Sequence, residues 1–440
     1  MKMKTYTTPQ KSILISMCTL LRISSYFLIL TFRGWGTQTF INGDDGTFLA
    51  EAYRSGFGSV LRPLYGDLLF GQRLCFYLIS LRPIDEAPKI MFISTILITS
   101  CLAVLIEKVV RKATSLSGGF VFALIFVALP PLNSNILGQF APFHTTSLTV
   151  LLVLVLVREF PASSIGQSLL ALFAFMVSIS HPFSFALYLP LVLNILSPNF
   201  VFRKGEKRFY ALLSLGICLQ IFVQLSNSLY GFNAPSVREF FYALRWMTYS
   251  LMPPPIRGKS LSESSLSNDW LASAIIASLL VMIVFSITCN KKITKNNSQI
   301  RISINMFLSA LLLMIAEFLL SSVRYQHYLI IPSMLFWGGC FFLIYSNVSD
   351  NLFLFIVLPS IFCLVFLLGA LQTMTLGEND HFYPLDNEYM NQREAFWVST
   401  LDENRARCRD VNNVGTVLLQ TMPSHLMSIR VPCRVLGGNN

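Results

Sequence analysis

Charge is what this sequence of 440 residues has least of. Asp, Glu, Lys and Arg make up 12% of the chain and hydrophobic residues 54%, and the mean hydropathy is +0.60. Several apolar runs of about 18 to 20 residues are long enough to cross the hydrocarbon core of a bilayer. The composition therefore predicts a membrane protein with many spans.

The motifs of several enzyme classes are also absent from the sequence. It contains no phosphate-binding P-loop, no Gly-x-Ser-x-Gly turn and no paired-Cys or His-Glu-x-x-His metal motif. These absences argue against ATP-driven transport, serine hydrolysis and zinc chemistry. The net charge is +11, but the basic residues lie in short loops between apolar runs, as cytoplasmic loops do. No basic helix or aromatic platform outside the membrane indicates nucleic-acid binding.

The apolar runs predict an all-α membrane protein with about eleven transmembrane helices. Basic clusters follow alternate spans, so the positive-inside rule places these loops on the same side as the N-terminal lysines. An odd number of crossings then leaves the tail from Thr373 outside. The predicted spans are Ser12 to Phe32, Lys89 to Leu105, Gly118 to Pro130, Phe143 to Val157, Gln167 to Ile179, Phe183 to Leu196, Tyr210 to Leu229, Leu271 to Ile287, Ile302 to Leu320, Tyr328 to Tyr345 and Leu352 to Leu371.

The first external loop, residues 34–88, concentrates acids, arginines and glycines. Asp44 and Asp45 lie in a predicted turn from Gly43 to Gly46, just beyond the first span. Adjacent carboxylates beside a low-dielectric surface can raise the proton affinity of one member, as a general base requires. A solvated Asp-Gly turn is the alternative interpretation. The rest of the loop predicts a short helix, a turn and a second amphipathic helix at the membrane interface.

Arginines in this loop could hold a phosphate, because a guanidinium presents a planar fork of donors and keeps its charge when desolvated. Arg73 is the best candidate, since it lies between two apolar stretches, where a charge needs an anionic partner. Arg54 and Arg62 are further candidates. Arg22, in the middle of the first span, is interpreted as a paired or snorkelling structural residue, with substrate binding as the alternative.

Two more polar groups are predicted on the external side. Asn133, Gln139 and His144 belong to a proline-flanked loop that could hydrogen-bond sugar hydroxyls, and ordinary turn chemistry explains them equally well. Glu317 and Arg324 are seven residues apart, which places them on one helix face, either as ligands or as an internal pair.

The nine cysteines fall mostly singly within apolar runs, where they are interpreted as small core residues. Cys408 and Cys433 differ, because both lie in the polar tail. They lack metal-ligand spacing, and the sequence leaves a disulfide and two free thiols equally open.

Taken together, these features resemble the GT-C class of membrane glycosyltransferases, particularly the bacterial and prophage glucosyltransferases that modify O-antigen. Four stretches carry the resemblance, in an order and spacing that extend through about three quarters of the chain. They are Asp44-Asp45, LRPLYGDLLFGQRL (61–74), HPFSFALYLPL (181–191) and RYQHYLIIP (324–332). His181 stands where a small residue is more usual before Pro-Phe, and the tail matches no pattern of the class.

The resemblance implies a GT-C-like domain over residues 1–372 and an external C-terminal tail or small domain over 373–440. It implies transfer of a sugar, glucosyl in this group, from a polyprenyl-phosphate donor to a polysaccharide or lipid-linked acceptor at the periplasmic face of a bacterial inner membrane. Asp44 or Asp45 would be the general base, and Arg73 and Arg324 would stabilise the leaving phosphate. No cofactor is expected, although the acid pair could bind a divalent metal. Further substrate contacts are expected from Arg62, Tyr65, Asn133, Gln139, His144, His181, Tyr325 and His327.

Two other classes of function compete with the enzyme. A flippase or transporter for lipid-linked sugars would use Arg22, Glu317 and Arg324 to line its path. A structural or assembly subunit is compatible with the apolar spans but leaves the grouping of Asp44 with Arg73 without a purpose. The external position of the acids and the unequal loop sizes favour the enzyme.

Overall fold

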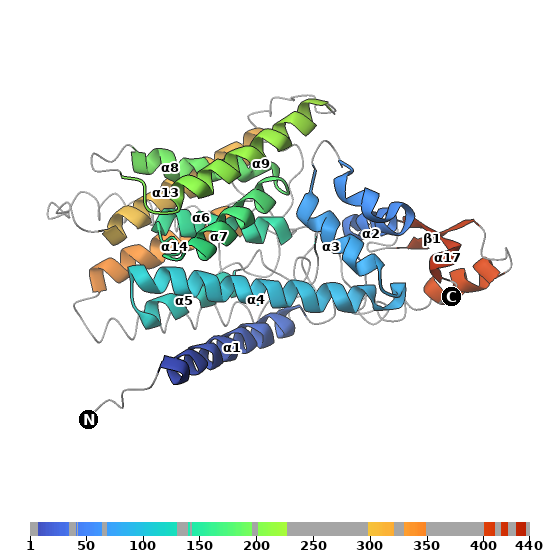
Figure 1. Cartoon of the computed structure of the whole chain (residues 1–440), viewed down its shortest axis with the longest axis horizontal. Coiled ribbons are helices and arrows are strands. Elements are labelled where there is room, and N and C mark those ends of the chain that lie inside the picture. The colour runs from blue at the N-terminus through green and yellow to red at the C-terminus, as the bar shows by residue number, and fades with distance from the viewer. Residues whose placement is uncertain are drawn as a thin grey trace, which may run out of the picture.

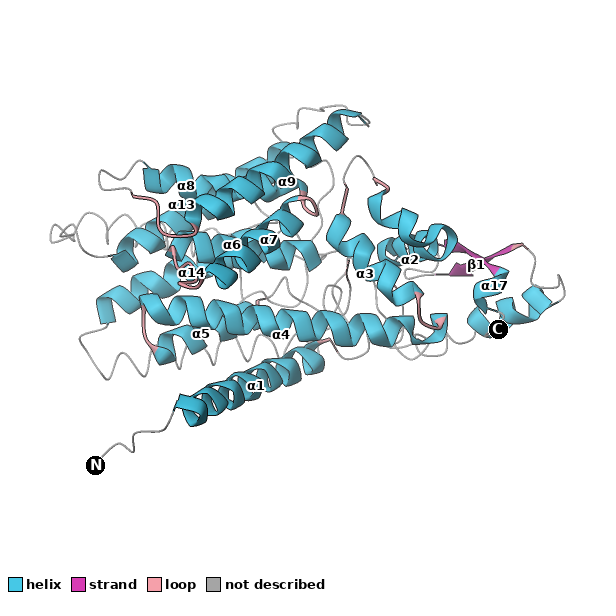
Figure 2. Ribbon diagram, viewed as in Figure 1, coloured by secondary structure: helices cyan, strands magenta, loops and turns pink. Residues whose placement is uncertain are grey.

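The structure is a computed structural model, and its described residues are 8–34, 41, 43–63, 68–129, 140, 143–195, 201–226, 298–320, 330–348, 400–409, 415–420 and 428–436. They are mostly helical, as predicted, with a two-stranded sheet near the C-terminus (Figure 2). In Figure 1 the long helices form a bundle, and a smaller unit, built from the segment after the first helix and from the C-terminal elements, lies at one end of it.

The bundle contains every predicted span that falls on described residues, and each of these segments is largely helical. Apolar side chains from its helices form the larger hydrophobic core. The predicted spans Leu271 to Ile287 and Leu352 to Leu371 lie outside the described residues. The helices are α1 (Thr8–Arg33), α4 (Ala87–Ala113), α5 (Leu116–Val127), α6 (Phe143–Val157), α7 (Ser164–Ser178), α8 (Tyr188–Ile195), α9 (Glu206–Ser226), α13 (Ser298–Leu320) and α14 (Ile330–Val348).

Two of these segments differ from the predicted spans. The segment predicted as one span from Phe183 divides into a 3-10 helix, η4 (Pro182–Leu187), and α8. Pro190 lacks an N–H to continue a helix from η4, but it is tolerated in the first turn of α8. Helix α4 continues past Leu105, where the predicted span ends, as far as Ala113. The additional turns contain charged residues, which the sequence analysis placed in a loop.

An ion pair explains how α4 continues beyond Leu105. Glu107 is fully buried, and it accepts hydrogen bonds from the guanidinium of Arg22 and, at 3.0 Å, from the hydroxyl of Tyr26. Both partners lie on α1, so the contact pins α1 against α4. The interpretation of Arg22 as a paired structural residue is confirmed.

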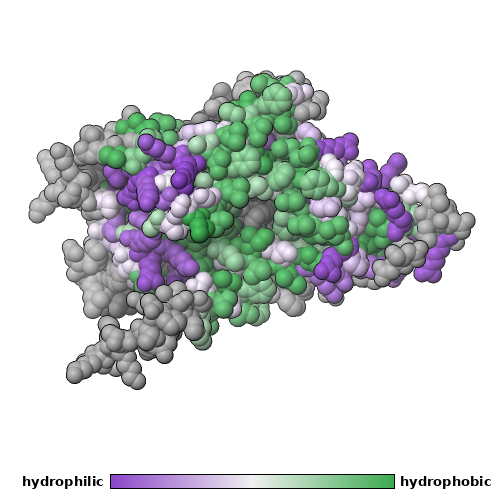
Figure 3. Space-filling model, in the orientation of Figure 1, coloured by the Kyte–Doolittle hydropathy of each residue, from purple (hydrophilic) through white to green (hydrophobic). Residues whose placement is uncertain are grey.

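An apolar belt crosses the middle of the molecule in Figure 3, with polar side chains gathered at both ends. Among the described residues, one helix, Ile84–Ala113, is long and apolar enough to cross a membrane, and most of its apolar stretch is buried within the protein. Shorter apolar helices accompany it, and the eleven spans stay a prediction.

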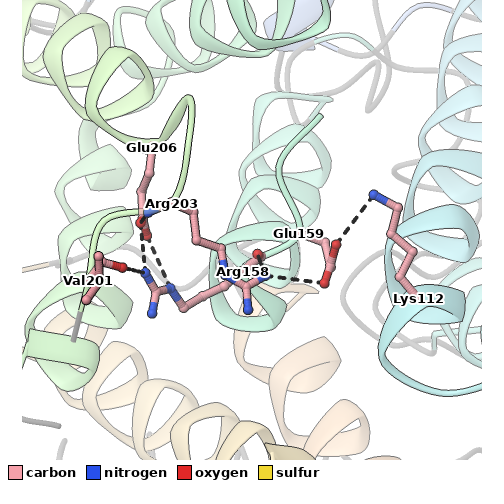
Figure 4. A network of polar contacts seen from close by, with 6 residues as sticks. All are labelled: Lys112, Arg158, Glu159, Val201, Arg203 and Glu206. Atoms are coloured by element: carbon pink, nitrogen blue, oxygen red, sulfur yellow. Dashed lines mark hydrogen bonds and ion pairs between the residues drawn. The ribbon is translucent and has the colours of Figure 1, made fainter. Parts of the chain in front are cut away.

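A charge network joins the basic loops at one end of the bundle (Figure 4). The guanidinium of Arg158 donates to Glu206 at 2.8 Å, and both side chains are buried. Glu159 contacts Lys112 at 3.4 Å and Arg203 at 3.3 Å. The loops after α4, α6 and before α9 therefore meet at one end, as the positive-inside rule predicted for them.

The opposite end holds the smaller unit, whose first half is the loop after α1. It contains α2 (Gly43–Ser55), the 3-10 helix η2 (Gly56–Leu61), α3 (Phe70–Ser80) and the 3-10 turn η3 (Ile84–Glu86). The predicted order of short helix, turn and second helix is confirmed. The predicted Gly-flanked turn is wrong, because Gly43 to Gly46 form the first turn of α2. Two carboxylates are favourable there, where the helix dipole is positive.

The second half of the smaller unit comes from the tail and is called the C-terminal unit here. It comprises a helix over 400–409, strand β1 (Thr416–Gln420), strand β2 (Ser428–Pro432) and α17 (Cys433–Leu436). The strands pair antiparallel with Leu419 opposite Ile429, and these two side chains face inward. Cys408 and Cys433 form a disulfide, which decides between the two alternatives that the sequence left open.

Candidate functional site

The N-terminal end of α3 is docked on the turn that follows α7. The backbone N–H of Gly71 donates to the hydroxyl of Ser180 at 2.8 Å, and the side-chain amide of Gln72 donates to the carbonyl of Ser180 at 3.3 Å. A β-carbon at position 71 would lie 2.9 Å from the Ser180 hydroxyl, so this close approach requires glycine. The contact joins residues 61–74 to Ser180, the residue just before the stretch 181–191.

Arg73, on α3, is almost fully buried and has an internal anionic partner. Its Nη1 donates to Oε2 of Glu51 at 2.6 Å and to the carbonyl of Ser59 at 3.0 Å. The guanidinium carbon also lies 5.1 Å from the ring centroid of Phe48, within the range of a cation–π contact. Nε and Nη2 are buried and make no hydrogen bond to any described residue. Two donor nitrogens of Arg73 are thus buried and unpaired among the described residues, and the remaining side of its guanidinium is occupied by Glu51.

Asp45 is fully buried in the first turn of α2. Its Oδ2 accepts a hydrogen bond from the backbone N–H of Phe140 at 3.2 Å. The ring of Phe140 packs edge-on against Phe76, and Phe76 stacks on Phe48 with centroids 5.4 Å apart. The acidic turn, Phe140 at the far end of the 130–142 loop, and the helix that carries Arg73 are therefore parts of one packed assembly. The side chain of Asp44, next to Asp45, lies outside the described residues.

The structure describes only some of the other predicted site residues. His181 is fully buried in the turn on which α3 docks. Arg62 is exposed, with its guanidinium 4.0 Å from Glu51. The backbone of His144 belongs to α6, but its side chain lies outside the described residues, as does the side chain of Glu317 on α13. The remaining predicted residues that lie outside are Tyr65, Asn133, Gln139, Arg324, Tyr325 and His327.

Three residues with roles in the assembly were not predicted as site residues. Glu51 is one of the acids of the first external loop, and it balances the charge of Arg73. Gln72 is buried and its Oε1 has no hydrogen-bond partner among the described residues, while Ser180 anchors α3. Gln72 and Ser180 are polar residues at the edges of apolar runs, and that placement is the signal that could have identified them.

The described residues contain no group of three His, Cys, Asp or Glu side chains that could hold a metal ion. The polar atoms brought together at this end are instead carboxylate, guanidinium, amide and hydroxyl groups. Such a set can accept a proton, pair with a phosphate and hydrogen-bond hydroxyl groups.

The sequence matches no protein-family model and no curated protein. The resemblance to GT-C glycosyltransferases therefore stays a prediction from the four sequence stretches.

Proposed function

We propose that the protein is an integral membrane glycosyltransferase that transfers a hexosyl group from a polyprenyl-phosphate donor to a cell-envelope polysaccharide such as O-antigen. One observation supports this proposal most directly. The acidic first turn of α2 and the guanidinium of Arg73, two of whose donors are buried and unpaired among the described residues, belong to one packed assembly at the end of the bundle opposite the basic network. A base and a phosphate-binding cation are the two groups that this transfer needs.

The two acids take different roles in the proposed mechanism. Asp45 is buried and holds the backbone at Phe140, so we assign it the positioning of Phe140. Asp44 is then the general base. It accepts the proton of an acceptor hydroxyl while that oxygen bonds to the anomeric carbon of the sugar. The bond from that carbon to the phosphate oxygen breaks with inversion, and the polyprenyl phosphate leaves with the bonding electrons.

Stabilisation of the leaving group falls to Arg73. The negative charge that develops on the phosphate oxygen pairs with the guanidinium, whose Nε and Nη2 have no hydrogen-bond partner in the part of the chain that the structure describes. Fixed charges in a site that excludes water commonly contribute the largest part of such rate enhancement. Arg324 is the proposed second cation, on the basis of the resemblance. The donor is already a phosphate ester, so the mechanism requires no metal to complete this charge balance.

The disulfide supports an external location for the site. Disulfides persist in oxidising compartments such as the bacterial periplasm, and Cys408–Cys433 lies at the same end of the bundle as α2 and α3. The basic network lies at the other end, which corresponds to the cytoplasmic side under the positive-inside rule. Both arguments place α2 and α3 on the external side of the membrane. A polyprenyl-phosphate donor presented on that side needs this orientation.

A flippase gains no support from the described residues. Its proposed path would use Arg22, but this guanidinium is engaged with Glu107 between α1 and α4, where it holds two helices together.

The test is transfer of labelled sugar from polyprenyl-phosphate sugar to envelope polysaccharide by membranes that contain the wild type, Asp44→Asn or Asp45→Asn. We expect Asp44→Asn to lose roughly 10² to 10⁴-fold in rate, the usual contribution of a general base. Asp45→Asn keeps an oxygen that can accept from Phe140, so we expect it to retain most of the transfer. Glu403→Gln, an exposed change in the C-terminal unit, is the matched control for loss of a carboxylate.

Three results would contradict parts of the proposal. Full transfer by Asp44→Asn would move the base elsewhere, and loss of transfer in Asp45→Asn alone would exchange the two roles. Absence of transfer by the wild type, with lipid-linked sugar still crossing the bilayer, would replace the enzyme by the flippase. Equal amounts of membrane-inserted protein, each with the Cys408–Cys433 disulfide formed, are required for the comparison.

A further inference from the structure

The C-terminal unit shares its hydrophobic core with α2. Its inward side chains lie in the same buried cluster as Phe48, Leu49 and Ala52 of α2, and β2 packs directly on that helix. Figure 1 shows the blue α2 and α3 next to the red C-terminal elements. The buried side chains that the C-terminal unit contributes are Leu401, Cys408, Leu419, Ile429, Val431, Cys433 and Leu436.

Polar ties reinforce this contact. Arg405 forms an ion pair with Asp85, in the turn η3 just before α4, and its Nε donates to the carbonyl of Leu436 at 3.3 Å. The hydrogen bond that Arg405 donates to the carboxylate of Asp85 raises the pKa of Arg405. Tyr53, on α2, donates to the carbonyl of Arg82 at 3.1 Å, and burial, with a smaller contribution from Asp85, raises its pKa. The connection between α3 and α4 is therefore bonded both to α2, through Arg82, and to the C-terminal unit, through Asp85.

The disulfide holds the C-terminal unit in its folded form. Cys408 ends the helix over 400–409 and Cys433 begins α17, 25 residues later. A folded unit of this size buries too little apolar surface to be stable alone, and chains below about 40 residues usually need a disulfide, metal or partner. The side chain of each cysteine is also part of the shared core. Loss of the bond therefore loosens the surface against which α2 packs.

We propose that the C-terminal unit is a clamp that positions α2, and with it the acidic first turn, so that full sugar transfer requires the Cys408–Cys433 disulfide. The inference rests on the proposed function for its catalytic part. Asp85 and Arg405 act as positioning residues, because they hold the clamp on the turn between α3 and α4 without contacting substrate. An enzyme of this design becomes fully active only after its tail has crossed the membrane and been oxidised.

A native thiol reports on the clamp independently of sugar transfer. Cys75, on α3, packs against the shared core, and burial raises the pKa of its thiol to about 11. Alkylating reagents react with the thiolate. We expect release of the clamp to loosen the core against which Cys75 packs and so to expose this thiol. Its pKa would then return towards the ordinary value of 9.0, a change of about two pKa units and so about 100-fold in thiolate at pH 8. Cys340, buried in the larger core, is the internal control.

The experiment compares folded, membrane-inserted wild type before and after mild reduction with Cys408→Ser, Cys433→Ser and the double variant. Alkylation of the Cys75 and Cys340 peptides is followed at pH 8 by mass spectrometry, and transfer kinetics are measured on the same samples. We expect Cys75 alkylation to rise between tenfold and 100-fold with no change at Cys340. We also expect kcat to fall at least tenfold with the donor KM unchanged, because a misplaced base affects the chemical step and not donor binding.

The three cysteine variants should have equal effects, since each removes the same bond, and reduction should change the double variant no further. Arg405→Ala should give a smaller effect in the same direction, which Arg405→Lys restores. Unchanged kcat after reduction, or unchanged Cys75 alkylation, would overturn the clamp. If the wild type transfers no sugar, the proposed function fails, whereas a rise in Cys75 alkylation would still establish that the disulfide holds this assembly together.

Discussion

Glu51→Gln tests whether Arg73 is a phosphate ligand or only a buried structural cation. The substitution keeps the shape of the side chain and an oxygen that can accept from Nη1 of Arg73, now 2.6 Å from the carboxylate. It removes the negative charge that balances a guanidinium whose side chain is 1% exposed. The two roles of Arg73 give different expectations for stability and for donor binding, so one variant separates them.

The stability change follows from the geometry of the pair. Removing one partner of a buried ion pair costs about 3–5 kcal/mol, but the retained neutral hydrogen bond recovers about 1 kcal/mol. The carboxylate of Glu51 is also 14% exposed, which moderates the loss. We therefore expect Glu51→Gln to lower the free energy of unfolding in detergent by about 2–3 kcal/mol.

Glu51→Gln should strengthen binding of the lipid-phosphate donor, although it lowers the stability of the protein. A carboxylate beside Arg73 repels the incoming lipid phosphate, and its neutralisation leaves the full guanidinium charge for that phosphate. We expect the donor KM to fall by about three- to tenfold, equivalent to about 0.6–1.4 kcal/mol, when the variant is assayed well below its unfolding temperature. A variant that is less stable but has the donor KM of the wild type would refute the assignment of Arg73 to the phosphate.

The matched control for this experiment is Glu159→Gln. Glu159 also contacts two cations, Lys112 and Arg203, but at the opposite end of the bundle (Figure 4) and with more exposure. Partly exposed ion pairs contribute about 0–1 kcal/mol, so a small loss of stability and an unchanged donor KM are expected.

Two further predictions concern the contacts of α4 with its neighbours. Glu107→Gln should destabilise the protein by about 3 kcal/mol, because it leaves Arg22 without its anion. The double variant Arg22→Met/Glu107→Gln should recover part of this loss in thermal unfolding. Losses of stability that simply add in the double variant would refute the pairing. Gly119→Val should separate α5 from α4 at a cost of about 1–3 kcal/mol, since a β-carbon there would lie 2.6 Å from the backbone oxygen of Glu107; unchanged thermal stability would show that the helices tolerate separation.

Helix positions were predictable because long apolar runs are a local signal. Helix α6 begins at Phe143 and ends at Val157, as the sequence predicted, since polar or helix-breaking residues lie just beyond both ends. The turn predicted at Gly43 to Gly46 was wrong because that prediction also used only the local sequence. Two glycines suggest a turn, but neither uses a positive φ, and the intervening acids favour the first turn of a helix.

The partners within the candidate site were not predictable, because they are distant in sequence. Gly71 and Ser180 are 109 residues apart, and Asp85 and Arg405 are 320 residues apart. Local patterns give the kind of partner that a residue needs but not its identity. The sequence showed that Arg73 needs an anion, and only tertiary packing selects Glu51.

The buried arginines Arg73 and Arg158 differ in how many of their donors are hydrogen-bonded. This difference separates a candidate phosphate ligand from a structural cation, which the sequence alone does not do. Arg158 uses Nε and Nη2 on Glu206 and the carbonyl of Val201, so its donors are engaged within the protein. Arg73 is equally dependent on a carboxylate, Glu51, yet two of its buried nitrogens make no hydrogen bond to any described residue. Leaving buried donors unsatisfied costs about 1–3 kcal/mol each, a cost that a bound phosphate removes. The unequal satisfaction of two similar ion pairs is therefore the physical reason why we propose Arg73, and not Arg158, as the ligand of the donor phosphate.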